Sequence, residues 1–61
     1  HIMSEELENA IQVLTQSFSD LRLVARGLKV DPEEVAEELA KAEPDTAEYV
    51  ALGILHELNP I

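Results

Sequence analysis

The chain has 61 residues, a net charge of −9 and no cysteine, and these properties exclude several classes of protein. This length suffices for one small domain, and the lack of cysteine excludes disulfides, thiolate metal ligands and a cysteine nucleophile. With 46% hydrophobic and 28% charged residues, the chain is expected to be globular. Thirteen acidic residues against four basic ones disfavour direct binding to nucleic acid and favour a basic protein surface as partner.

The first three residues, His1-Ile2-Met3, have no helical pattern of their own and precede a strong helix start. They are interpreted as a cloning remnant, which leaves residues 4–61 as a single helical domain. No apolar run approaches the roughly 18 residues that a membrane span needs. The sequence therefore predicts a cytoplasmic protein that makes no membrane contact.

A long first helix is predicted over residues 5–26. Ser4 is a favourable N-cap, and three glutamates follow it in the first turns, where their charge suits the helix dipole. Apolar residues then recur from Leu7 to Leu28 at alternating spacings of four and three, which is a heptad pattern. Gly27 is expected to end the helix in the left-handed conformation.

The apolar stripe of this first helix is longer than two shorter helices are expected to cover, and a domain of this size has a small core. We therefore expect a homodimer through the first helix. Because the helix is acidic at its start and basic at its end, antiparallel pairing is favoured. The residues expected at the dimer interface are Leu7, Ile11, Leu14, Phe18 and Leu21.

A short second helix is predicted over residues 32–42. Asp31 is its N-cap and Pro32 its first residue, and Glu34 completes a capping box with Asp31. Pro44 then prevents helical geometry at the residue before it, so the helix must end there.

A third helix is predicted over residues 46–58, with Asp45 as its N-cap. Its apolar residues recur on one face, from which Tyr49 and Leu52 are displaced. Gly53 lies inside this pattern and suggests a close helix contact or a bend. No strand alternation appears in the chain, so the predicted fold class is all-α, a module of three helices.

Residues 21–39 resemble the helix-turn-helix pattern of bacterial DNA-binding regulators. The resemblance rests on a small residue in the first helix, a short turn, and a capped second helix with apolar anchors. It departs from that family at Lys29, where a turn glycine is usual. The residues that carry it are Ala25, the turn at 28–30, Val35 and Leu39. The resemblance implies a DNA-related scaffold.

The outer face of the second helix is acidic, whereas a recognition helix needs basic or amide side chains to reach bases and phosphates. Residues 31–48 hold eight acidic residues and only Lys41 as a base. Direct binding of nucleic acid is therefore not expected. The acidic face is either a solvated surface or a docking surface for a basic partner, and the partner-binding candidates are Glu33, Glu34, Glu37 and Glu38.

No catalytic or metal-binding pattern emerges. His56 is alone outside the first three residues, and the hydroxyl residues have no base and orienting group at a suitable spacing. We expect no cofactor, no metal and no enzymatic activity. The sequence predicts a small acidic module for protein interaction and dimerisation. The alternative is a regulator related to helix-turn-helix proteins, or a DNA-mimicking inhibitor, that acts through protein contacts.

Overall fold

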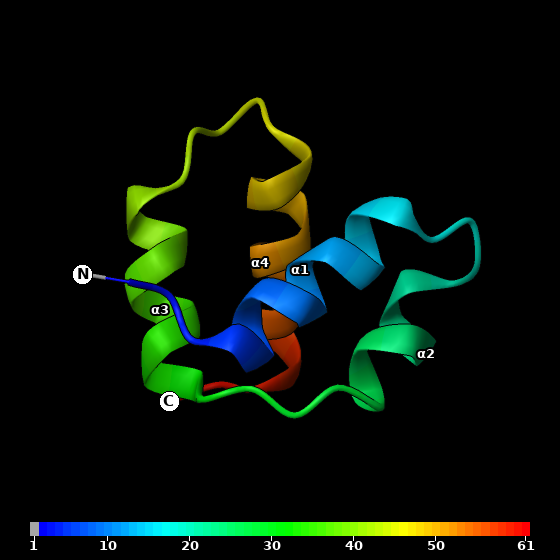
Figure 1. The fold of residues 1–61 in the computed structure, drawn as a ribbon, viewed down its shortest axis with the longest axis horizontal. Helices are drawn as coiled ribbons and strands as arrows, with labels where there is room; N and C mark the ends of the chain where they lie inside the picture. The colour runs from blue at the N-terminus through cyan, green and yellow to red at the C-terminus, as the bar shows by residue number, and fades with distance from the viewer. Residues whose placement is uncertain (1) are drawn as a thin grey trace.

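The computed structural model describes residues 2–61, and every regular element in that range is a helix (Figure 1). His1, part of the predicted cloning remnant, lies outside the described residues. The all-α prediction is confirmed, and the predicted helices at 32–42 and 46–58 are correct to within one residue. The helices are α1 (Glu5–Gln16), α2 (Leu21–Arg26), α3 (Pro32–Lys41) and α4 (Ala47–Leu58).

The predicted long helix over residues 5–26 is wrong, because the chain leaves helical geometry after Gln16 and re-enters it at Leu21. In the loop between them, the Ser19 N–H donates to Ser17 Oγ at 3.2 Å. Asp20 then caps α2, and its Oδ1 accepts a hydrogen bond from the Arg22 N–H at 3.0 Å. Short polar side chains offer the backbone local hydrogen bonds that compete with the helix. The module therefore has four helices within residues 2–61.

The other helix starts follow the expected capping chemistry with one exception. Ser4 caps α1 as predicted, and its Oγ accepts from the Leu7 N–H at 3.2 Å. Asp31 caps α3 through the Glu33 N–H at 3.0 Å, with Pro32 at the first position. The predicted cap of α4 is displaced by one residue, because Thr46 performs this role and its Oγ1 accepts from the Tyr49 N–H at 3.1 Å.

Helix α4 lies at the centre of the fold and packs against each of the other three helices. Figure 1 shows α3 on one side of it and α2 on the other, with α1 crossing in front. The apolar face predicted for this helix is misplaced, because Leu52 is fully buried beside Leu55 whereas Val50 is 53% exposed. A helix with neighbours on several sides buries residues around more of its circumference than a surface helix does.

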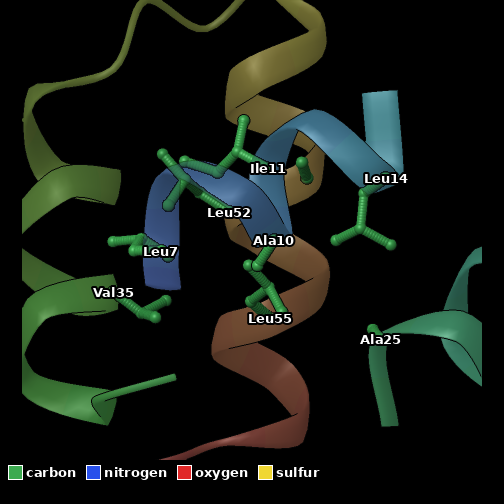
Figure 2. Packing of buried hydrophobic residues seen from close by; sticks show 9 residues of the cluster. Leu7, Ala10, Ile11, Leu14, Ala25, Val35, Leu52 and Leu55 are labelled. Atoms are coloured by element: carbon green, nitrogen blue, oxygen red, sulfur yellow. The ribbon is translucent and has the colours of Figure 1, made fainter. Parts of the chain in front are cut away.

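The core contains residues from all four helices, and within residues 2–61 it holds no buried polar or charged residue. Figure 2 shows these side chains converging between α1, α3 and α4, with Ala25 reaching in from α2. Met3 packs against the cluster, so part of the segment interpreted as a remnant contributes to the fold. The buried residues are Leu7, Ala10, Ile11, Leu14, Ala25, Val35, Ala51, Leu52 and Leu55.

Gly27 does not take the left-handed conformation that its position suggests, and Gly53 makes no close helix contact. Gly27 follows α2 with φ −86°, which is an ordinary right-handed conformation. A Cβ added at Gly53 would meet nothing within 4 Å, so the expected close helix contact at this residue is not formed. Both positions have room for a larger residue.

Candidate functional site

A shallow groove lies where the end of α1 meets the starts of α2 and α4. It encloses about 240 Å³, and none of its lining side chains is charged although the chain carries 13 acidic residues. The lining residues are Leu14, Thr15, Ser17, Leu21, Ala47, Val50 and Ala51. We call this groove together with the adjacent Phe18 the Phe18 surface.

Phe18 lies in the loop between α1 and α2, and its relative exposure is 105%. The preceding residue, Ser17, is one of the groove-lining residues. On the α4 side of the groove, Val50 is 53% exposed. A fully exposed aromatic ring next to further exposed apolar area is a common mark of an interaction site.

The five residues predicted for the dimer interface separate into two groups. Leu7, Ile11 and Leu14 are buried in the core of the chain itself, because α4 and the neighbouring helices cover this half of the stripe. Leu21 is half-buried and Phe18 is exposed. A second molecule could reach the first three only if the domain opened, so the accessible part of the predicted interface is the Phe18 surface.

The four glutamates predicted as a single partner surface also separate. Glu33 and Glu37 are exposed, whereas Glu34 and Glu38 are half-buried. The Glu38 carboxylate lies 3.7 Å from the Lys41 ammonium. A shallow depression of about 410 Å³ next to α3 is lined by Ser4 and by four acidic residues, Asp31, Glu33, Glu34 and Glu37.

Glu34 connects α3 to the start of α1. The Ser4 N–H donates to Glu34 Oε2 at 2.7 Å, and Ser4 Oγ donates to Oε1 at 2.6 Å. These hydrogen bonds favour the charged carboxylate and lower the pKa of Glu34 below its ordinary value. Glu34 therefore does not form the predicted capping box, and its carboxylate is engaged within the fold. The contact spans 30 residues of sequence, and no local pattern could have shown it.

Three of the four basic residues lie on or directly after α2. Arg22 Nη2 pairs with the Glu57 carboxylate of α4 at 3.0 Å, and both side chains are more than half exposed. Arg26 and Lys29 are exposed, and neither forms an ion pair with any residue between 2 and 61. Of these three basic residues, only Arg22 is therefore neutralised by an ion pair within residues 2–61.

His56 is half-buried near the end of α4, and its Nδ1 has no hydrogen-bond partner among residues 2–61. In the same range, no group of three or more His, Asp or Glu side chains is arranged to hold a metal ion. None of the four helices is both long enough and apolar enough to cross a membrane.

The two helices of the segment that resembles a helix-turn-helix lie on opposite sides of the molecule, each packed against α4 (Figure 1). Ala25 is buried in the shared core, and Figure 2 places it across that core from Val35. The relation to DNA-binding regulators stays a prediction based on sequence.

Comparison of the chain with protein-family models, with curated proteins and with solved structures gives no match. The function is therefore inferred from the chemistry of the surfaces described above.

Proposed function

We propose that the chain is a small, acidic, non-catalytic protein-interaction module that binds its partner through the Phe18 surface. The observation that carries the proposal is the full exposure of Phe18 beside a groove without charged residues. Interfaces derive much of their binding energy from a few aromatic anchors that enter complementary pockets.

The position of Phe18 favours binding over folding as the role of this residue. Its ring contributes nothing to the buried core. Burial of such a ring at an interface stabilises a complex by about 1.5–3 kcal/mol. The loop is short and is held by the hydrogen bonds of Ser17 and Asp20, so little conformational entropy remains to be lost on binding.

The exposed acidic residues add charge selectivity to this proposal. Glu33 and Glu37 extend from α3 into solvent, and the chain as a whole carries nine net negative charges. Such a field attracts a basic protein surface and raises its rate of association more than its final affinity. We assign this role to Glu33 and Glu37 rather than to Glu34, whose carboxylate is engaged by Ser4.

A photocrosslinking experiment in cells tests the proposal. Phe18 is replaced by photoreactive benzoylphenylalanine, and Ile61, an apolar residue with 80% exposure, is replaced in the same way as the matched control. We expect a discrete protein adduct after irradiation at position 18 and none at position 61. Adduct formation at position 18 that does not exceed the control would contradict the proposed function.

A further inference from the structure

Helix α2 is the shortest of the four helices and lies at the periphery of the fold (Figure 1). It has six residues, whereas the other three have ten or twelve. A helix this short is not stable on its own in water. Of the nine buried residues within residues 2–61, α1, α3 and α4 contribute eight and α2 contributes only Ala25. The main part of the core therefore depends little on α2.

One side of α2 covers apolar side chains of α1 and α4. Leu21 lines the groove of the Phe18 surface together with Leu14 and Ala51, which are each 2% exposed. Val24 is half-buried and packs against the same core. The opposite side of α2 faces solvent, where Leu23 is 63% exposed. Movement of α2 away from α1 and α4 would therefore widen the groove and uncover buried apolar surface.

Opposite charges hold α2 against the rest of the molecule. Arg22 Nη2 lies 3.0 Å from the Glu57 carboxylate of α4, and both side chains are more than half exposed. Residues 20–30 contain three basic residues and Asp20, a net charge of +2, which leaves −11 for the other residues of a chain with net charge −9. Salt screens exposed charges, because the Debye length falls from about 10 Å at 0.1 M to about 3 Å at 1 M. The attachment of α2 should therefore weaken as the salt concentration rises.

We propose that α2 is a salt-sensitive lid, which opens as one unit and uncovers Leu14 and Ala51 while α1, α3 and α4 stay folded. Local opening of this kind occurs in elements that bury little apolar surface and are held by exposed interactions. The inference goes beyond the proposed function, because the opening requires no partner and no partner enters its test.

Native-state amide hydrogen exchange of the full chain tests the lid, with urea added below the unfolding transition. The reporters are the N–H groups of Val24, Gly27 and Leu28, each of which donates to a backbone carbonyl at 3.1 Å in or next to α2. We expect their protection factors to be about tenfold or more below those of α4, with one shared opening constant and a weak dependence on urea.

Two results of this experiment would overturn the lid. Protection factors and a urea dependence equal to those of α4 would mean that α2 opens only when the whole domain unfolds. Three unrelated opening constants for the reporters would mean that α2 opens residue by residue and not as a unit.

Salt tests the electrostatic part of the proposal. From about 0.1 M to about 1 M sodium chloride, the protection of the three reporters should fall. Protection in α4 should not fall, because screening relieves the repulsion among the residues that together carry −11. Reporter protection that stays constant or rises with salt would overturn the salt sensitivity.

A substitution in α4 tests the same attraction from outside the lid. Glu57→Gln removes the carboxylate opposite Arg22 and should lower reporter protection about twofold to fivefold at low salt. The matched control is Glu37→Gln, which removes the same charge from an exposed residue of α3, on the other side of α4 from α2 (Figure 1), and should leave the reporters unchanged. Equal effects of the two substitutions would overturn the role given to the ion pair.

Discussion

One part of the apolar stripe predicted for the first helix is buried in the core, and the next part is exposed to solvent. Leu7, Ile11 and Leu14 of α1 are buried under α4 and its neighbours, whereas Phe18, next in the same heptad pattern, is fully exposed. The apolar spacing is the same in both parts, and the difference lies in the four residues 17–20, where hydroxyl and carboxylate side chains compete for the backbone hydrogen bonds. Periodicity therefore identifies the apolar positions, and capping chemistry decides which of them share a helix.

Truncation within the buried part should have the largest effect on stability. Leu7 has no exposed surface, and Leu7→Ala should lower the free energy of unfolding by about 2–5 kcal/mol. A domain of this size has only about 3–5 kcal/mol in total, so the variant should be largely unfolded at room temperature. Thermal denaturation followed by circular dichroism measures this, and Phe18→Ala is the control from the exposed part, with an expected change within about 0.5 kcal/mol. Equal effects of the two truncations would remove the contrast between the two parts.

The start of the buried part depends on Ser4. Ser4→Ala removes the N-cap of α1 and the hydroxyl hydrogen bond to Glu34. The free energy of unfolding should fall by about 1–2 kcal/mol. Urea denaturation provides the measurement, and Ser4→Thr, which can still cap the helix, should recover most of the loss. A Ser4→Ala variant as stable as the original chain would show that α1 does not need this anchor.

The hydrogen bonds between Ser4 and Glu34 should make the stability of the domain sensitive to pH. Glu34→Gln leaves the cap of α1 in place, so its effect should be smaller than that of Ser4→Ala. Because the folded-state pKa of Glu34 is below its unfolded value, the advantage of the original chain should be full at neutral pH and should disappear as the pH falls through the lowered pKa. Melting temperatures from neutral to acid pH test this, with the exposed Glu33→Gln as the matched control. A stability difference that does not change with pH would contradict the role given to the carboxylate.

The stability of α2, which begins after the break between the two parts, should depend on its N-cap Asp20. Asp20→Ala removes the N-cap of α2 and should lower the free energy of unfolding by about 1 kcal/mol, whereas Asp20→Asn should retain most of the capping. Amide hydrogen exchange should show faster exchange at α2 than at α1 in the alanine variant. If the amides of α1 and α2 lost protection equally in Asp20→Ala, the two helices would open together despite the break between them.

The smallest expected change is a gain in stability in α4, the helix against which both parts pack. A Cβ at Gly53 has open space, so Gly53→Ala should stabilise the domain by about 0.5–1 kcal/mol through better helix propensity. Urea denaturation measures it, and Ala40→Gly in α3 should give a loss of similar size. A destabilised Gly53→Ala variant would mean that α4 requires flexibility at this residue.

Local signals predicted α3 and α4 well because their boundaries are marked by proline and capping residues. Asp31-Pro32 fixes the start of α3, and Pro44 lies just after its end. The same kind of signal is present in the serines and aspartate of residues 17–20, although the heptad pattern continues across them. The break in the first predicted helix could therefore have been found from the sequence.

The candidate site was only partly predictable, because it depends on contacts between distant residues. The heptad pattern points to Phe18, whereas Val50, which lines the groove from another helix, falls on the apolar face that the sequence predicts to be buried. Likewise, nothing near Glu34 in the sequence indicates that its carboxylate accepts hydrogen bonds from Ser4. Which apolar and acidic residues remain exposed is decided when the helices pack.

The central place of α4 has a consequence for the order of folding during synthesis. Protein chains emerge from the ribosome with the N-terminus first, and α4 comes after the three helices that pack around it. Until residues 47–58 have emerged, the apolar sides of α1 and α3 lack the helix that covers them. Most of the folding free energy should therefore be gained in one late step, after α4 has emerged. Until then the apolar sides of α1 and α3 should stay accessible on the nascent chain.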